Sequence, residues 1–292
     1  MNAAGLYCGV MWANDGMPRH EVICDGEVIP IDFSAGIPLP ASSQRWCIGY
    51  YDFRDSLTGM HVPCLKGSEL TSGHQCRDCQ YREGFVALHH ARTIDEVPPQ
   101  LRKYVAQEHL LYLATFGIDV VKIGTAAQSR HPVRWYEQGA LAALVLATVR
   151  DGIEVRRMES SLSRSYGLTQ ALRGASKAML LAEPPTLVEL AGGLHRVVEQ
   201  MTAAGESFQP GPVWHGNLGA VTQRTAPTGR LRVVPTGSTE WELTGSPDAV
   251  GQCLIWTSPT DVFVMDVKPL VGRAVTFTTV GAGGPPQQIA LL

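Results

Sequence analysis

The chain has 292 residues, long enough for one large domain or two to three small ones. Hydrophobic residues make up 45% and charged residues 17%, a globular balance without extended disorder. The formal net charge is −3. A protein that holds duplex nucleic acid through its phosphates is usually basic, so this charge argues against general DNA binding and leaves only a local arginine patch open.

The compartment is expected to be the cytoplasm. The N-terminal segment lacks the basic start and apolar core of a secretory signal, and no apolar run reaches the roughly 18 residues of a membrane span. In a reducing compartment, clustered cysteines bind metal rather than one another, and the chain has seven cysteines.

Short strands are expected over residues 1–45, where apolar and polar residues alternate between DG and PLP turn sequences. Cys8 and Cys24 lie in these strands. We expect both to be small core residues, because free cysteine is often buried, and we interpret Cys253 in the same way.

Four cysteines in residues 46–85 follow the pattern C-x16-C-x11-C-x2-C. A C-x2-C turn lets two thiolates reach one tetrahedral ion while backbone N–H groups stabilise their charge. The segment is polar and glycine-rich, so a bound ion must supply the free energy that burial does not. We expect a closed, structural zinc site. In the alternative, His61 or His74 replaces one of the cysteines. The expected ligands are Cys47, Cys64, Cys76 and Cys79.

Residues 107–167 predict a β-hairpin, a helix, a strand and a second helix. The runs HLLYLATFG and DVVKIGT flank a tight turn, and Pro132 suits the first turn of the helix that follows. The second helix has an apolar stripe formed by Val155, Met158, Leu162 and Tyr166. Glu159 lies at the edge of that stripe, so it is either a boundary residue or part of a site.

The expected fold class is α+β, in three parts. Residues 1–106 form an N-terminal β region with the zinc knuckle at 46–85. Residues 107–205 form the central domain with two further helices, and a Pro/Gly-rich boundary covers 206–228. Residues 229–292 contain the β segments GRLRVVPTG, TEWELTG, GQCLIWTS, DVFVMDVKPLVG and RAVTFTTVG, which predict a small barrel or sandwich. This module would bind nucleic acid, cover the central site or form a homodimer.

The central stretch resembles the GIY-YIG nuclease superfamily. Leu110-Leu111-Tyr112 takes the place of GIY, and Lys122-Ile123-Gly124 that of YIG. Arg134 stands at the superfamily's helix arginine, with Arg130 as the alternative, and Glu159 at its metal-binding glutamate. A narrower resemblance, to an uncharacterised GIY-YIG-like family, rests on the four-cysteine segment followed by H-x-x-Y-L-A, V-K-I-G-T, R-W-x-x-Q-G-A and the later GQCLIW.

The resemblance implies a metal-dependent site for phosphodiester cleavage. Tyr112 would orient or deprotonate a water, Arg134 would stabilise the developing charge, and Glu159 would hold one Mg²⁺. The residues then expected around the substrate are His109, Gly124, Thr125, Arg130, Trp135 and Gln138.

Each catalytic candidate also has a structural interpretation. Tyr112 would be a core tyrosine, Arg134 would pack on Trp135, and Glu159 would pair with Arg156 on its helix. The four residues in the superfamily's order favour a site over these separate interpretations.

Two departures separate the chain from the superfamily pattern: the first glycine is missing, and Lys122 replaces a tyrosine. A lysine binds phosphate or carboxylate as a cation, or acts as base or nucleophile when its pKa is depressed. Three functions remain: an enzyme for a small carboxylate or phosphate compound, which the altered motifs favour; a Mg²⁺-dependent phosphodiesterase or endonuclease on nucleic acid; and a non-catalytic nucleic-acid-binding or adaptor protein.

Overall fold

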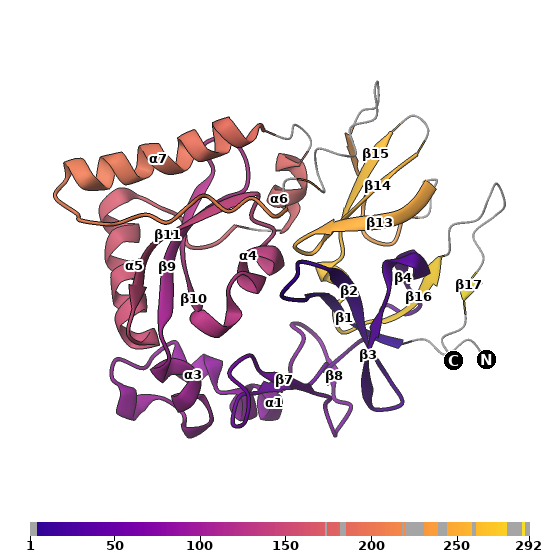
Figure 1. The fold of residues 1–292 in the computed structure, drawn as a ribbon. Coiled ribbons are helices and arrows are strands. Elements are labelled where there is room, and N and C mark those ends of the chain that lie inside the picture. Colours follow the sequence, from indigo (N-terminus) through magenta and orange to yellow (C-terminus); the bar gives the residue numbers. More distant parts are fainter. Residues whose placement is uncertain are drawn as a thin grey trace.

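The protein has mixed α and β structure, as expected for the α+β class. The computed structural model describes residues 5–172, 174–181, 185–217, 219, 231–238, 244–258, 261–278 and 288–289. Within these ranges the strands form three larger sheets and two short ladders (Figure 1). No helix of the described chain is long and apolar enough to cross a membrane.

The central sheet has the strand order β10-β9-β11, all antiparallel. Its strands are β9 (His109–Thr115), β10 (Val121–Ala127) and β11 (Ala142–Val149). Asp119 adopts a left-handed conformation with φ 58° in the turn between β9 and β10, as tight hairpin turns require. The predicted hairpin and third strand are confirmed.

Helices cover both faces of this sheet (Figure 1). The helices are α4 (Val133–Gln138), α5 (Gly152–Tyr166), α6 (Gly174–Leu180) and α7 (Leu187–Ala203). Leu111 and Leu113 face a core shared with α5 and α7, which includes the predicted stripe of α5. Tyr112 points to the opposite face, where Trp135 of α4 covers it. Alternate residues of β9 therefore serve two different cores.

Local sequence sets the ends of the two long helices. Asp151 caps α5 by accepting hydrogen bonds from the backbone N–H groups of Ile153 and Glu154. Thr186 and Glu189 form a capping box at the start of α7. Such caps satisfy N–H groups that have no partner within the helix.

The two ends of the chain meet in one sheet. The order is β17-β16-β1-β2-β3, with β4 also on β16, and β16 pairs antiparallel with β1. The strands are β1 (Gly5–Trp12), β2 (Pro18–Cys24), β3 (Glu27–Ile31), β4 (Ile37–Pro40), β16 (Ala274–Thr278) and β17 (Gln288–Ile289). The expected N-terminal β region and C-terminal β module thus share a sheet, because strand pairing does not follow distance along the chain.

A four-stranded sheet with the order β12-β15-β14-β13 packs on the sheet that contains β1 and β16. Its strands are β12 (Leu231–Val233), β13 (Thr244–Val250), β14 (Cys253–Thr257) and β15 (Val262–Asp266). Tyr7 and Val22 share a core with Trp256 and Phe277. Most of the predicted segment TEWELTG and much of the predicted boundary 206–228 lie outside the described residues.

Short elements surround the four cysteines and run along the lower side of Figure 1. They are β5 (Arg45–Trp46), β6 (Tyr50–Asp52), β7 (Met60–Val62), β8 (Glu69–Leu70), α1 (Arg77–Glu83), α2 (Phe85–Leu88) and α3 (Arg102–Ala106). Short 3₁₀ turns are Phe33–Ala35, Ile94–Glu96, Pro99–Leu101, Gln128–Arg130 and Lys268–Leu270. Arg156 and Arg157 of α5 donate to the carbonyls of Leu88 and Arg92, at 2.7 and 2.6 Å, which fixes this region to the central domain.

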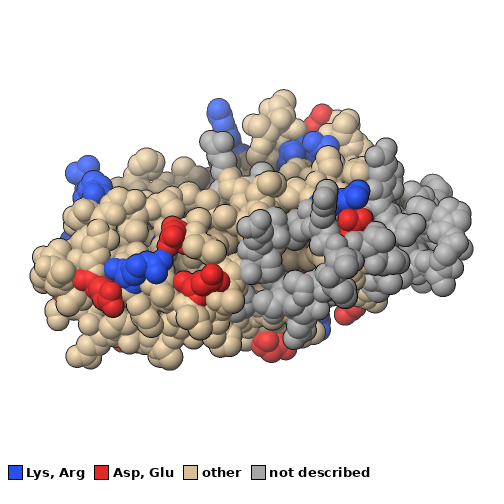
Figure 2. Space-filling model, turned by 90° about the horizontal axis from the view of Figure 1, so that it is seen from above, with Lys and Arg blue, Asp and Glu red and all other residues tan. Residues whose placement is uncertain are grey.

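Charge is sparse on the face that lies over α7 and the C-terminal strands. Figure 2 shows most of the described surface there as uncharged, with Lys and Arg side chains few and mostly near Asp or Glu. This face offers no broad basic surface among its described residues.

Candidate functional site

Four residues from four different elements border one cavity of about 610 Å³. Tyr112 comes from β9, Lys122 from β10, Arg134 from α4 and Glu159 from α5. Gly124, Thr125 and Gln138 line the same cavity. The structure therefore brings together seven residues that the sequence singled out.

Strand register places Tyr112 beside Lys122. Gly124 of β10 lies opposite Tyr112 of β9, and Lys122 shares the face of Gly124 because side chains alternate along a strand. A Cβ on Gly124 would lie 2.7 Å from Tyr112 Oη and 2.8 Å from Tyr112 Cζ. The glycine of KIG is thus needed because the phenol lies across its backbone.

Several buried polar atoms around the cavity have no hydrogen-bond partner among the described residues. They are Tyr112 Oη, both amide atoms of Gln138, and Arg156 Nη2. Buried polar groups are nearly always paired with protein, water or ligand. The convergence of such atoms on one cavity indicates that water or a ligand supplies the missing partners.

Cations dominate the lining of the cavity. They are Arg92, Lys122, Arg134, Arg156, Arg157 and Arg164, whereas Glu159 is the single carboxylate among the described lining residues. Glu159 forms no ion pair with a described residue, and the expected pair with Arg156 is not formed. Arg156 instead donates to the carbonyls of Gly152 and Leu88. An ion pair therefore does not account for the position of Glu159.

Burial and mutual charge shift the titration of these groups. Burial, then Arg134 and Lys177, lower the pKa of Lys122 to about 8, against the attraction of Glu159. Burial raises the pKa of Glu159, although Lys122 and Arg134 act against it. Burial raises the pKa of Tyr112 to about 12. At neutral pH Tyr112 keeps its proton, so Lys122 loses a proton more easily than Tyr112 does.

The other predicted substrate residues lie beside this cavity rather than in it. Trp135 is buried and packs edge-on against Tyr112, with ring centroids 5.7 Å apart. His109 and Arg130 line an adjacent cavity of about 370 Å³ that is rich in aromatic side chains. Arg134 borders both cavities. Arg130, the alternative to Arg134, is paired with Glu137 at 2.5 Å and does not border the larger cavity.

Sequence reasoning missed the arginines of α5 and of the segment before β9. Arg156, Ser160 and Arg164 follow a four-residue spacing, so they share one helix face that borders the cavity. That spacing could have indicated a polar helix face at a binding site, but an ordinary solvent-exposed helix face has the same spacing. Arg92 reaches the cavity from the distant segment after α2.

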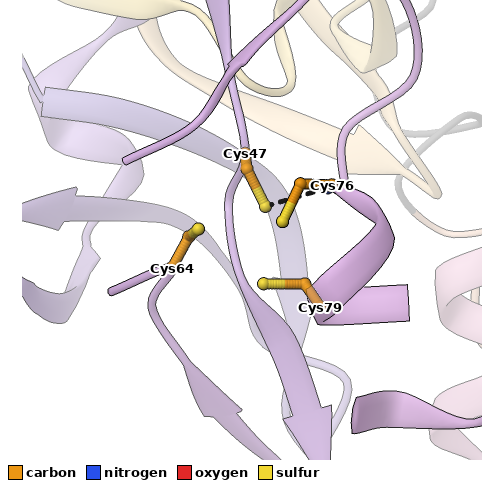
Figure 3. Close-up of side chains that lie close together, drawn as sticks. All are labelled: Cys47, Cys64, Cys76 and Cys79. Atoms are coloured by element: carbon orange, nitrogen blue, oxygen red, sulfur yellow. Dashed lines mark hydrogen bonds between the residues drawn. The ribbon is translucent and has the colours of Figure 1, made fainter. Parts of the chain in front are cut away.

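The four predicted cysteines form one cluster, in which the sulfur atoms lie within 4.8 Å of one another. Figure 3 shows Cys47 and Cys64 on loops and Cys76 and Cys79 at the start of α1. The backbone N–H group of Cys76 donates to Cys47 Sγ at 3.2 Å, as Figure 3 shows, and that of Gly49 donates to the same sulfur at 3.4 Å. These four side chains could hold a metal ion, and donation to sulfur is what a thiolate ligand needs.

The pKa values of the thiols in the cluster are shifted in different directions. Although burial opposes it, backbone N–H groups of Ser68 and Lys66 lower the pKa of Cys64 to about 6. Burial and neighbouring cysteines raise the pKa of Cys79. Crowded thiols resist full ionisation unless a cation compensates their charge.

The alternative in which a histidine replaces one cysteine is not seen. Neither His61 nor His74 belongs to the cluster of four sulfur atoms. His61 Nε2 lies 2.8 Å from the carbonyl oxygen of Ile48, and its Nδ1 lies 3.2 Å from Glu21 Oε2.

Comparison with known proteins identifies the family of the chain. No curated protein and no solved structure matches the chain. A family model with the description "Protein of unknown function (DUF2797)" matches residues 59–210, just over half of the chain, and the protein therefore belongs to this family.

Proposed function

We propose that this protein is a zinc-containing, GIY-YIG-like enzyme that binds a phosphate-bearing substrate in the cavity of Tyr112, Lys122, Arg134 and Glu159, and hydrolyses its phosphate ester. The observation that carries the proposal is the combination of six cations with unpaired buried polar atoms around a single cavity. An anion with several acceptor oxygens satisfies both features.

Phosphate suits this cavity better than a small carboxylate does. Five of the cations that line it are arginines, and the planar guanidinium pairs two N–H donors with two phosphate oxygens. A single carboxylate offers two oxygens, which leaves most of these donors unused. The cavity also has room for a group larger than a simple acid.

The side chains divide the chemistry among them. Lys122, with its lowered pKa, takes a proton from an attacking water. Tyr112 stays protonated and orients that water or a phosphate oxygen. Arg134, whose side chain is 45% exposed, stabilises the charge that grows on phosphorus-bound oxygens. Lys122 then passes this proton to the oxygen of the departing alcohol, and Glu159 attracts the ammonium of Lys122 while it carries the proton.

The residues around Glu159 do not form a ready site for magnesium. Glu159 is one carboxylate among six cations, and no group of three acidic, histidine or cysteine ligands includes it among the described residues. Magnesium usually takes one or two carboxylates with substrate oxygens and waters. The positive lining opposes a divalent cation until an anionic substrate has entered.

Zinc is the metal that the four cysteines suit best. Four sulfur ligands at C-x2-C spacing form a closed tetrahedral set for this ion. Cys79 begins the segment that leads through α2 to Arg92, and α5 holds this segment by Arg156 and Arg157. The metal would stabilise one wall of the cavity and take no part in the reaction.

Nucleic acid is the second candidate substrate, because the outer cations of the cavity are exposed. Arg92, Arg157 and Arg164 are all exposed at its border. A small substrate would not reach all three, whereas a strand that leaves the cavity would. This would be an endonuclease or phosphodiesterase.

Calorimetry with a short and a long oligonucleotide, together with turnover of bis(p-nitrophenyl) phosphate, tests the proposal. We expect binding and turnover, and Lys122→Met should weaken binding by about thirtyfold or more, as loss of one desolvated charge contact does. Tighter binding of the long strand, lost in Arg157→Ala, supports nucleic acid. Binding without turnover of any phosphodiester contradicts the enzyme and supports an adaptor.

A further inference from the structure

A second group of metal-type ligands lies outside the cysteine cluster. Cys8 Sγ, a carboxylate oxygen of Glu21 and a ring nitrogen of His61 lie within 4.8 Å of one another. They come from β1, β2 and β7. We propose that Cys8, Glu21 and His61 bind a second zinc ion, separate from the four-cysteine site and exchangeable with solvent.

The imidazole of His61 is held as a ligand. Its Nε2 lies 2.8 Å from the carbonyl oxygen of Ile48, so Nε2 carries the proton and donates it there. Nδ1 then presents a lone pair. A second-shell hydrogen bond of this kind to a carbonyl is the usual support of a metal-bound histidine.

The contact between His61 Nδ1 and the Glu21 carboxylate needs a cation between the two acceptors, which is either a second ring proton shared with the carboxylate or a bound metal ion. Nδ1 lies 3.2 Å from Glu21 Oε2, with the two side chains only 4% and 6% exposed. Nδ1 has no hydrogen-bond partner among the described residues. Zinc bonds of about 2.0 to 2.1 Å in a tetrahedral arrangement separate two such ligand atoms by about 3.3 Å. The spacing in the structure fits that separation.

A β-bulge brings Cys8 to this position. The β1–β2 ladder pairs Tyr7 with Val22 and Gly9 with Glu21, so Cys8 is the extra residue. Bulges redirect a side chain and are frequent beside functional sites. Gly9 has φ 120°, and a Cβ there would meet Gln252 Oε1 at 2.8 Å.

The GQCLIW segment holds the bulge in place. Gln252 accepts from Val10 N at 2.9 Å and donates to Val10 O at 2.7 Å. Tyr51 also supports the site, because its hydroxyl donates to Glu21 Oε2 at 3.3 Å. Residues far apart in sequence thus hold the three ligands together.

The site faces a cavity of about 590 Å³, which all three ligands line. Three protein ligands leave the fourth zinc position for water, in contrast to the closed four-sulfur set. Arg134 borders this cavity and the larger cationic cavity. The second ion would therefore lie within the same group of cavities as the proposed substrate.

Metal analysis of the full chain, saturated with zinc and freed of excess ion, tests the inference. We expect two zinc ions per wild-type chain and one in Cys8→Ser and His61→Gln. Cys24→Ser is the matched control, because Cys24 ends β2 but belongs to neither ligand group, and it should keep two.

X-ray absorption at the zinc edge tests the inference on the wild-type protein alone, so it decides the question even if a variant does not fold. Wild-type protein with two ions should show nitrogen and oxygen ligands beside sulfur, and a mild chelator should remove the mixed-ligand ion first. One zinc per wild-type chain with sulfur ligands alone would overturn the inference. So would two ions retained in folded His61→Gln. This result does not depend on whether the enzyme proposal holds.

Discussion

Gly124 lies directly opposite Tyr112 in the β9–β10 ladder, and the phenol of Tyr112 occupies the space that a Cβ on Gly124 would need. The contact is to the reactive end of the side chain, since the shortest distance, 2.7 Å, is to Oη. A backbone position thus determines where the hydroxyl of the candidate site lies.

Gly124→Ala should displace the Tyr112 hydroxyl while the fold survives. The methyl group must push the ring aside, because it would lie within 3.0 Å of Tyr112 Oη, Cζ and Cε2. We expect turnover of bis(p-nitrophenyl) phosphate to fall by roughly a hundredfold, the effect of a misplaced catalytic group. Gly192→Ala is the control. The nearest atom to its Cβ is Arg196 Nη1 at 3.5 Å, so the variant should keep wild-type turnover. Equal turnover in the two variants would show that Tyr112 has no role.

Oligonucleotide affinity should fall as the pH rises through about 8. Lys122 is an ammonium below that pKa and neutral above it, whereas phosphodiesters stay ionised throughout. The attraction is therefore present at low pH and lost at high pH. Calorimetry from pH 6 to pH 9.5 checks this, and Lys122→Met should remove much of the pH dependence. An unchanged pH profile in that variant would assign the titration to another group, with Lys177 the first to examine because its pKa is also lowered to about 8.

Loss of one ligand should empty the four-cysteine site. We expect Cys76→Ser and Cys79→Ser to lose this metal and to unfold at least about 3 kcal/mol more easily, because a structural ion supplies folding free energy. Metal content and denaturant unfolding measure the two effects, with Cys24→Ser as the control. Full metal content in both variants would refute the site.

Acid should destabilise the fold through His20. Burial lowers its pKa from 6.5 to about 3, and Tyr7 Oη and the carbonyl of Gly36 contact its ring at 3.1 Å. The unfolded chain takes up this proton below pH 6.5 and the folded chain does not, so stability is full above pH 6.5 and declines toward pH 3. At pH 5 the loss is about 2 kcal/mol. Unfolding of His20→Gln should show a flatter pH dependence between pH 7 and pH 5, and an equal slope in both proteins would contradict this origin.

Local patterns predicted the strands and helices of residues 107–167 well. The apolar runs of β9 and β10, the turn at Asp119 and the stripe of α5 are short-range signals, and each element formed where expected. The C-x2-C spacing of Cys76 and Cys79 is equally local. These features need no knowledge of the rest of the chain.

Local sequence patterns could not predict the features that depend on residues far apart in the chain. Cys8 was interpreted as a core residue, yet its position depends on a bulge and on Gln252 near the other end of the chain. The pairing of β1 with β16 has no sequence signal either. Arg156 was expected only as an ion-pair partner of Glu159, because neither its backbone partners nor the cavity can be read from its helix alone.

The most direct measurement compares binding and turnover in Glu159→Gln. The substitution removes the single described carboxylate from a cavity lined by six cations. Oligonucleotide binding should become tighter, while turnover of bis(p-nitrophenyl) phosphate should fall by about 10² to 10⁴-fold, as for loss of a group that assists proton transfer. Turnover equal to that of the wild type would contradict the central claim that Glu159 belongs to a catalytic site.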